Sequence, residues 1–331
     1  MLMVILGAGA SYDSSPDYPP SHVLPARPPL ANELFHQRYL RFRTEFPQFL
    51  GLLAELVPKP GRSIEDALQR LQHDGRTNPA RVTQLTAIRY YLRSLLESTA
   101  RDWLSVNGDH STYNNLLEQI QNHREDEESV CLVTFNYDTL LESALRKQCG
   151  MSFDVVPDYV SHPQFKLFKL HGSTNWGRLV TSAPTRLGGT WKPEDVISSA
   201  HLFTISDQYA TYDGYVGQLF PAIAIPVTEK QVFECPSDHV GQLRELIPQV
   251  TKVLTIGWRG TESHFLSLLH DHYGRSGHGP ITVVTVAGTE EEAEQTLQNL
   301  RKTAMGIGEH VALAGFSDTI GDRKLDGFFA R

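Results

Sequence analysis

The sequence is poor in cysteine. Its 331 residues include only Cys131, Cys149 and Cys235, which lie far apart in the chain. Three cysteines cannot make a fully paired disulfide framework, and none belongs to a Cys-x-x-Cys half-site for structural zinc. The composition therefore predicts a protein of a reducing compartment, which we take to be the cytoplasm, and no zinc or other metal site.

Long apolar runs are also missing. The apolar N-terminus stops at Gly7 and has no basic flank, so it does not resemble a secretory signal. No other run approaches the roughly 20 apolar residues that a helix needs to cross a bilayer. The sequence therefore predicts no association with a membrane.

Charge of one sign is not concentrated anywhere. Lys and Arg number 30, Asp and Glu number 38, and the net charge is -8. Without a basic stripe to neutralise phosphates, direct binding of nucleic acid is not expected. The acidic cluster at 125–128 is interpreted as a solvated connector, with a partner-binding patch as the alternative.

An apolar run at 3–6 leads directly into a glycine-rich turn. That turn reads Gly7, Ala8, Gly9, Ala10 and Ser11. Such a turn after a buried parallel strand lets the backbone approach a pyrophosphate and presents amides to it. The third glycine of the dinucleotide fingerprint is replaced by Tyr12, so a plain strand-to-helix turn is the alternative.

A proline-rich loop and a helical segment follow. Six prolines lie between Pro16 and Pro29, where neither a helix nor a central strand is expected. From 30 to 128 the apolar spacing becomes helical. The residues that carry this spacing are Ile64, Leu68, Leu71, Leu85, Ile88, Leu92, Leu95, Leu96, Tyr113, Leu116, Leu117 and Ile120. We expect a helical insertion lobe within a single domain that spans 1–331.

Strands and helices alternate in the remainder of the core, 129–331. Strands are predicted at 130–135, 165–170, 222–225, 253–256 and 281–286, and helices after Asp138 and around Leu297. This alternation predicts an α/β fold with a doubly wound parallel sheet, interrupted by the helical insertion after its first strand-to-helix turn.

Two further motifs follow predicted strands, at the edge where open α/β sheets bind ligands. The first contains Thr134, Asn136 and Asp138, whose amide and carboxylate could orient a water or ribose hydroxyl and hold a carboxamide. Its alternative is a turn residue with a helix cap. The second contains His171 and Gly172: the histidine suits a general base, and the alternative is a structural histidine.

A histidine cluster near the C-terminus is a weaker candidate. It comprises His264, His270, His272 and His278, together with Asp271. A metal site is one interpretation. The preferred one is that these side chains lie at the end of a helix and in the turn that follows it, without binding a metal.

Taken together, the three strand-end motifs resemble those of the sirtuin family. The glycine-rich turn at 7–11 is similar to the family's G-A-G-x-S motif. The segment 134–138 resembles its T-Q-N-x-D motif, and the segment 170–172 resembles the histidine-glycine pair that carries the catalytic histidine. Gly257 resembles a later glycine turn only loosely. The resemblance covers 3–11, 130–138, 165–173 and more weakly 222–288, and it implies a Rossmann-like sirtuin core.

The departures from the family concern the handling of protein substrates. Deacetylating sirtuins have a four-cysteine zinc module, for which this chain has too few cysteines. Where they have a D-F-R element this chain has the proline-rich loop, and in place of their G-T-S turn it has Gly-Trp-Arg-Gly at 257–260. This pattern is similar to bacterial sirtuin-like NAD hydrolases of anti-phage defence, which also have a helical insert.

The resemblance implies NAD as substrate and a NAD glycohydrolase activity. Asn136, His171 and Asp138 would be catalytic, and the first turn, Thr134 and Gly257 would bind NAD. The alternatives are a protein deacylase or ADP-ribosyltransferase, and a non-catalytic sensor of NAD or ADP-ribose. The resemblance also implies that the NAD hydrolase activity is controlled, either by formation of a homo-oligomer or by a partner such as a DNA-translocating ATPase or a short prokaryotic Argonaute. Arg27 and Arg259 are both candidates for the phosphates.

Overall fold

The computed structural model describes most of the chain. The described ranges are 1–15, 26–57, 63–123, 128–180, 203–205, 218–227, 233–273, 279–303 and 306–330. Most of the proline-rich loop, most of the acidic cluster and His278 lie outside these ranges. The features predicted for them are therefore not addressed by the structure.

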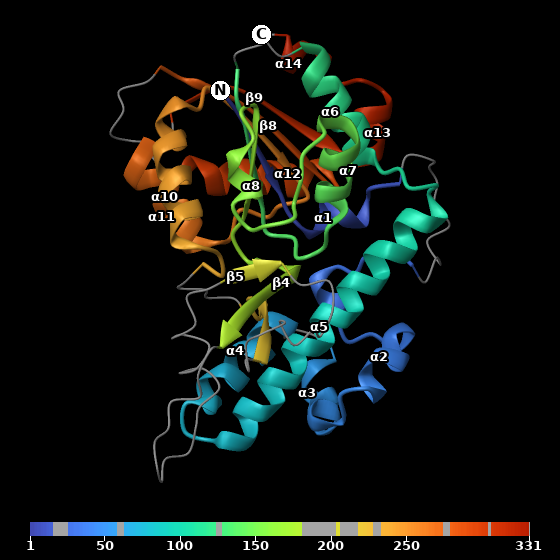
Figure 1. Ribbon diagram of the computed structural model, residues 1–331. Helices are drawn as coiled ribbons and strands as arrows, with labels where there is room; N and C mark the ends of the chain where they lie inside the picture. The colour runs from blue at the N-terminus through green and yellow to red at the C-terminus, as the bar shows by residue number, and fades with distance from the viewer. Residues whose placement is uncertain are drawn as a thin grey trace.

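A six-stranded parallel sheet forms the centre of the molecule (Figure 1). Its strands are β3 (Phe165–Lys169), β2 (Val130–Thr134), β1 (Leu2–Leu6), β7 (Lys252–Ile256), β8 (Ile281–Ala287) and β9 (Ile307–Ala314), in that spatial order. The chain winds outwards from β1 in one direction and from β7 in the other, which places a topological switch point between these two strands. The predicted doubly wound α/β fold is confirmed.

Burial on both faces explains the composition of the inner strands. All five residues of β1 and of β2 are buried, and both segments are nearly continuous runs of aliphatic residues. Helices supply this cover (Figure 1). One side has α6 (Thr112–His123), α7 (Leu140–Cys149), α13 (Phe316–Gly321) and α14 (Asp326–Phe329), and the other has α10 (Ser237–Leu246), η4 (Ile247–Gln249) and α11 (Ser263–Tyr273). Two further helices, α8 (Asp158–Ser161) and α12 (Glu290–Arg301), contact β3 and β8 respectively.

The strand assignments differ from the sequence prediction at 222–225, and strands β4 (Gly172–Val180) and β5 (Phe203–Ile205) were not predicted. The segment predicted at 222–225 is not part of the parallel sheet: it ends β6 (Gln218–Ile223), which pairs antiparallel with β4. With β5, these strands make a separate three-stranded sheet. Strand β4 begins three residues after β3, which leaves no room for the helical crossover that parallel pairing requires. It therefore leaves the parallel sheet, and β6 pairs with it there. The edge strand β9 was not predicted.

The segment from 30 to 128 is helical in its described part. It contains η1 (Ala31–Glu33), η2 (Gln37–Tyr39), α2 (Leu40–Thr44), η3 (Pro47–Leu52), α3 (Leu53–Leu56), α4 (Ile64–Gly75), α5 (Pro79–Val106) and α6. Local chemistry sets several boundaries: Asn78 accepts the amide of Ala80 before Pro79 begins α5, and Ser63 and Asp66 form a capping box on α4. The organisation as an inserted lobe within one domain stays a prediction.

Two hydrophobic clusters share these helices. The lobe cluster, built mainly from residues 34–96, includes Phe35, Phe49 and Tyr91, whereas the sheet cluster includes Trp103 and Tyr113. The long helix α5 contributes to both, and α6 packs entirely with the sheet. None of the helices in the described ranges is long and apolar enough to cross a membrane.

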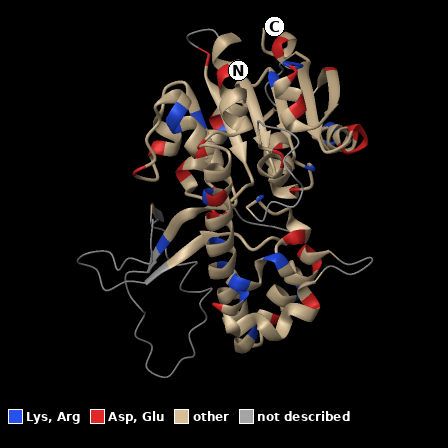
Figure 2. Ribbon diagram, turned by 90° about the vertical axis from the view of Figure 1, so that its right-hand side faces the viewer, with Lys and Arg blue, Asp and Glu red and all other residues tan. Residues whose placement is uncertain are grey.

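Direct contacts join the lobe helices to the end of β6 in the three-stranded sheet and to the turn after β7 in the parallel sheet. Arg89 of α5 donates to the carbonyl oxygen of Ile223 at 2.8 Å, and Glu65 of α4 forms an ion pair with Arg259 at 2.8 Å. The side chain of Tyr137 also packs against the lobe cluster. Acidic and basic residues are intermixed along the ribbon (Figure 2).

The buried histidine of α10 predicts how stability changes with pH. Burial lowers the pKa of His239 to about 4 from 6.5, although a hydrogen bond to the backbone of Val156 acts in the opposite direction. Between these values the folded chain binds fewer protons than the unfolded chain. The free energy of unfolding should therefore fall by about 2–3 kcal/mol between pH 7 and pH 4.5 because of this residue.

Urea unfolding of the unsubstituted protein and of His239→Gln at both pH values measures this effect. Other groups also titrate in this range, so the difference between the two proteins isolates the histidine. Equal losses of stability in both proteins would contradict the prediction.

Candidate active site

Three neighbouring strands bring the predicted motifs to one edge of the sheet. Strands β3, β2 and β1 are adjacent and parallel, so the turns that follow Leu6, Thr134 and Lys169 meet at their carboxyl ends. The amide of Phe135 donates to the carbonyl oxygen of Leu6 at 3.0 Å, and the amide of Leu170 donates to that of Thr134 at 3.1 Å. The three motifs are thus joined through their backbones.

The first turn packs closely against Gly257. Helix α1 (Ala8–Tyr12) begins directly after Gly7, and a Cβ on Gly7 would lie 2.4 Å from the carbonyl oxygen of Gly257. The amide of Gly9 donates to this same oxygen at 3.1 Å, and the amide of Ala10 donates to the carbonyl oxygen of Gly7. The amide of Gly7 also donates to the carbonyl oxygen of Ile256 at 3.0 Å, so three of the amides predicted to meet a pyrophosphate are used within the protein. Ala8 is exposed, whereas Ala10 is buried.

The side-chain amide of Asn136 lies over this turn. Its Nδ2 donates to the carbonyl oxygen of Gly7 and to Oγ of Ser11, both at 2.9 Å. Because a carbonyl oxygen can only accept, the atom that faces Gly7 must be the nitrogen. The opposite atom, Oδ1, is buried and has no hydrogen-bond partner among the described residues.

The hydroxyl of Thr134 supports the same motif from below. Its Oγ1 accepts the amide of Asn136 at 3.1 Å and donates to the carbonyl oxygen of Leu6 at 3.4 Å. The side chain is only 2% exposed. Thr134 therefore holds the backbone of the motif, and its predicted contact with NAD stays a prediction.

A tyrosine from the helical segment completes the contacts of Asn136. Tyr113 of α6 has its hydroxyl 3.0 Å from Oγ of Ser11 and 3.4 Å from Nδ2 of Asn136. Burial raises the pKa of Tyr113 well above its ordinary value, and the negative charge of Asp138 raises it further. The phenol therefore stays protonated. In the sequence, Tyr113 fits only the apolar spacing of a helix, although a buried tyrosine hydroxyl generally needs a partner.

Removing this hydroxyl should affect both stability and turnover. We expect Tyr113→Phe to lower the free energy of unfolding by about 1–2 kcal/mol, since Ser11 loses a partner. The matched control is Tyr91→Phe, which removes an equally buried hydroxyl that donates to the carbonyl oxygen of Leu34 in the lobe. Both variants should lose similar stability in urea unfolding, and only Tyr113→Phe should lower the NAD turnover that the sequence predicts. Equal turnover in the two variants would contradict this role.

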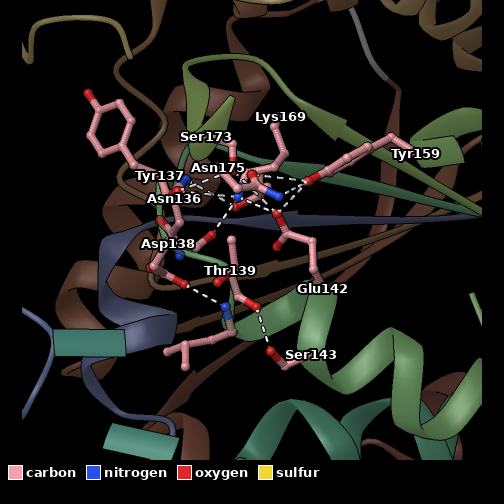
Figure 3. A network of polar contacts seen from close by, with 12 residues as sticks. Asn136, Tyr137, Asp138, Thr139, Glu142, Ser143, Tyr159, Lys169, Ser173 and Asn175 are labelled. Atoms are coloured by element: carbon pink, nitrogen blue, oxygen red, sulfur yellow. Dashed lines mark hydrogen bonds and ion pairs between the residues drawn. The ribbon is translucent and has the colours of Figure 1, made fainter. Parts of the chain in front are cut away.

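Asp138 lies at the start of α7. One carboxylate oxygen accepts the amide of Leu140 at 3.1 Å, and the side chain is 8% exposed (Figure 3). The N-cap of α7 is Thr139, so Asp138 contacts the first amide of the helix from one residue before the cap position. This hydrogen bond leaves part of the carboxylate for other contacts, so its predicted contact with NAD stays a prediction.

Aromatic rings surround His171. Its ring lies 4.8 Å from that of Phe135 and 5.8 Å from that of His264, measured between centroids. Tyr137 lies near-parallel at 6.3 Å, and Trp258 stacks on the far side of Phe135 at 5.7 Å. The imidazole is only 4% exposed. This setting orients the ring through packing.

Three histidines of the cluster near the C-terminus, His264, His270 and His272, lie in the described residues, and all three belong to α11. His264 belongs to the ring stack around His171, which the sequence analysis missed, whereas His270 and His272 lie in the last turn of α11. No group of three or more potential metal ligands occurs in the ranges that the structure describes.

The two candidate arginines have different partners. The guanidinium of Arg27 lies 3.7 Å from the ring centroid of Tyr12, and its Nε donates to the carbonyl oxygen of Tyr12 at 2.8 Å. Arg259 pairs with Glu65 and is 72% exposed. Arg27 therefore lies against the first turn, and Arg259 faces the lobe.

Comparison with known proteins identifies the family. Residues 130–307, more than half of the chain, match the family model described as a SIR2-like domain. No curated protein matches the chain.

Similar solved structures have low sequence identity. A mutant Sir2 homologue with 2′-O-acetyl ADP-ribose is 12% identical with a TM-score of 0.49, covering 100% of this chain and 93% of that one. A Sir2 homologue with NAD is 13% identical with a TM-score of 0.43, covering 99% and 88%. Sir2Tm with a propionylated peptide is 13% identical with a TM-score of 0.41, covering 100% and 94%. On the match of the family model, the chain belongs to the SIR2-like domain family.

Proposed function

We propose that the chain hydrolyses NAD at the bond between nicotinamide and ribose, giving nicotinamide and ADP-ribose. The observation that carries the proposal is the side chain of Asn136, whose Oδ1 is buried without a hydrogen-bond partner among the described residues. An unsatisfied buried carbonyl oxygen costs free energy. Its position, next to the first turn and at the same sheet edge as His171, supports a ligand that supplies a hydroxyl or water there.

The placement of the motifs supports NAD as that ligand. They lie at the carboxyl edge of the sheet, beside the switch point between β1 and β7, where doubly wound folds bind nucleotides. In the proposed arrangement the pyrophosphate lies beside Ala8 and Gly9, and Asp138 holds the nicotinamide carboxamide. Arg27, which lies against this turn, is the better placed of the two candidate arginines.

The proposed chemistry needs one nucleophile and one base. Water attacks the ribose C1′ while the bond to the pyridinium nitrogen breaks, and nicotinamide leaves with the bonding electrons. Asn136 orients the water or a ribose hydroxyl through Oδ1. A ring nitrogen of His171 takes the proton, a contribution of about 10²–10⁴-fold in rate. The pyridinium is already a cationic leaving group, so the proposal includes no metal.

The region around Gly257 favours hydrolysis over transfer to a protein. In deacetylating sirtuins the corresponding turn helps to hold an acyl-lysine peptide. Here Trp258 is 3% exposed and packs on Phe135, and Arg259 pairs with Glu65 of the lobe. These side chains are engaged within the protein itself. The three cysteines of the chain are also too few for a four-cysteine zinc module.

A second part of the proposal concerns control. A NAD hydrolase that acted continuously would deplete the NAD of its own cell, so we propose that assembly or a partner protein switches it on, as in an effector of anti-phage defence. The lobe, which contacts the site through Glu65 and Tyr137, is the proposed docking element. A monomer that is fully active at nanomolar concentration without any partner would contradict this.

The direct test is to incubate the purified protein with NAD and resolve the products by liquid chromatography. Equal amounts of nicotinamide and ADP-ribose, absent with Asn136→Ala, would support the proposal. Release of nicotinamide only in the presence of an acylated peptide would favour the deacylase. Tight NAD binding without turnover, at high protein concentration and with candidate partners added, would favour the sensor.

A further inference from the structure

A buried ion pair lies beneath the motif that carries Asn136. Lys169 is the last residue of β3, and Glu142 is in the first turn of α7. Nζ of Lys169 is 2.7 Å from Oε1 of Glu142, and the two side chains are 0% and 1% exposed. Removing two charges from water costs free energy that their attraction alone need not recover, so such a pair calls for further hydrogen bonds.

The further hydrogen bonds of Lys169 go to the backbone of the motif. Its ammonium group has three hydrogens. Besides Glu142, it donates to the carbonyl oxygen of Asp138 and, at 3.4 Å, to that of Tyr137 (Figure 3). Lys169 therefore holds the carbonyl groups of the two residues that directly follow Asn136.

Glu142 connects the same network to the strand that follows His171. Its Oε1 also accepts the hydroxyl of Tyr159 at 3.2 Å and that of Ser173 at 3.4 Å. Ser173 and Asn175 belong to β4, and Asn175 hydrogen-bonds to Tyr159 (Figure 3). The ion pair therefore links the turn that carries Asn136 to the turn that carries His171.

We infer that Lys169 and Glu142 are positioning residues, which fix the peptide groups after Asn136 relative to the strand that begins after His171. The inference rests on the proposed function, because Asn136 and His171 must act on the same substrate. A displacement of about 1 Å in such a pair of groups is enough to lower a rate by about 100-fold. A simpler alternative is that the two charges only neutralise each other.

The double variant Lys169→Met/Glu142→Gln separates these two roles. Lys169→Met alone leaves an uncompensated buried carboxylate and should be strongly destabilised. The double variant removes both charges and should recover much of this stability, but no ammonium group remains to hold the two carbonyl oxygens. We expect its kcat for NAD to stay about 10- to 100-fold below that of the unsubstituted protein, with a much smaller change in KM.

Hydrogen exchange gives a second measurement that does not depend on turnover. The amide of Thr174 donates to the carbonyl oxygen of Tyr137 at 2.8 Å, and the amide of Leu140 donates to Asp138. Both amides should exchange faster in the double variant if the pair positions the motif. The control is Leu167→Ala, a fully buried residue of β3 that is not part of the network. It should lose stability but keep kcat and the exchange rates of both amides.

The outcomes are distinguishable. A double variant with recovered stability, unchanged kcat and unchanged exchange at both amides would overturn the inference and leave only charge neutralisation. If the unsubstituted protein does not turn over NAD, the proposed function fails, and the exchange rates of these two amides alone decide the positioning role.

Discussion

Replacing His171 with alanine should lower the turnover of NAD by about 10²–10⁴-fold, the usual contribution of a positioned general base. In the proposed reaction its ring accepts the proton of the attacking water or of a ribose hydroxyl. The ring is 4% exposed and is held by Phe135 and His264 at 4.8 and 5.8 Å. The other histidine of this stack, His264, lies in α11, whereas His171 follows β3, the strand next to the one that leads to Asn136. Product formation followed by liquid chromatography measures the loss.

A second variant distinguishes chemistry from packing. Removal of a buried ring leaves a cavity, so His171→Ala should also lose stability. His171→Phe keeps a ring between Phe135 and His264 but has no atom that accepts a proton. We expect His171→Phe to be as inactive as His171→Ala and more stable in urea unfolding. Turnover close to that of the unsubstituted protein in His171→Phe would show that the base is another group.

Replacing Gly257 with alanine should cause a large loss of stability. Its φ is +59°, and a Cβ would lie 2.2 Å from the amide nitrogen of Ala10 and 2.4 Å from the carbonyl carbon of Gly9. The left-handed backbone costs a side chain about 1–2 kcal/mol, and overpacking typically adds about 1–3 kcal/mol. We expect a total of about 2–5 kcal/mol in urea unfolding, together with weaker binding of NAD because the first turn must move.

Gly150→Ala is the matched control for this substitution. Gly150 has a φ of +65° at the end of α7, and a Cβ there would meet nothing within 4 Å. Its free energy of unfolding should fall only by the cost of the left-handed backbone, about 1–2 kcal/mol. Its binding of NAD, measured by calorimetry, should stay unchanged. If the two variants lost equal stability and bound NAD equally well, the close packing of the first turn against Gly257 would have no energetic role.

The fold was largely predictable because its central strands are unusually uniform. Strands β1, β2, β7 and β8 are buried runs of aliphatic residues, and each was predicted within one or two residues. Edge strand β9 lacks this signal, since its residues at 308–311 are exposed on one edge of the sheet. The segment at 222–225 has an apolar pattern that does not reveal its partner, and only the structure shows its antiparallel pairing with β4.

The clustering of the candidate residues was predictable where they follow strands, and not where they come from other elements. Asn136 and His171 lie at the ends of adjacent parallel strands, so the sequence order was enough to bring them to one edge. Tyr113 reaches Ser11 from α6, more than 100 positions along the chain, through a contact that no local pattern encodes. Lys169 and Glu142 were also missed, because a buried lysine within a strand pattern has no distinguishing sequence signal.

The division of α5 between two hydrophobic clusters limits how the chain can be shortened. The helix has 28 residues and is about 42 Å long. Its first part, to Leu96, packs in the lobe, whereas Ala100 and Trp103 pack with the sheet, and Nε1 of Trp103 donates to Ser14 just after the first turn. A deletion of all of 30–128 would therefore remove part of the sheet's own cover. A shortened chain that keeps this cover would have to begin again within α5 and keep α6, so the two hydrophobic clusters meet inside a single helix.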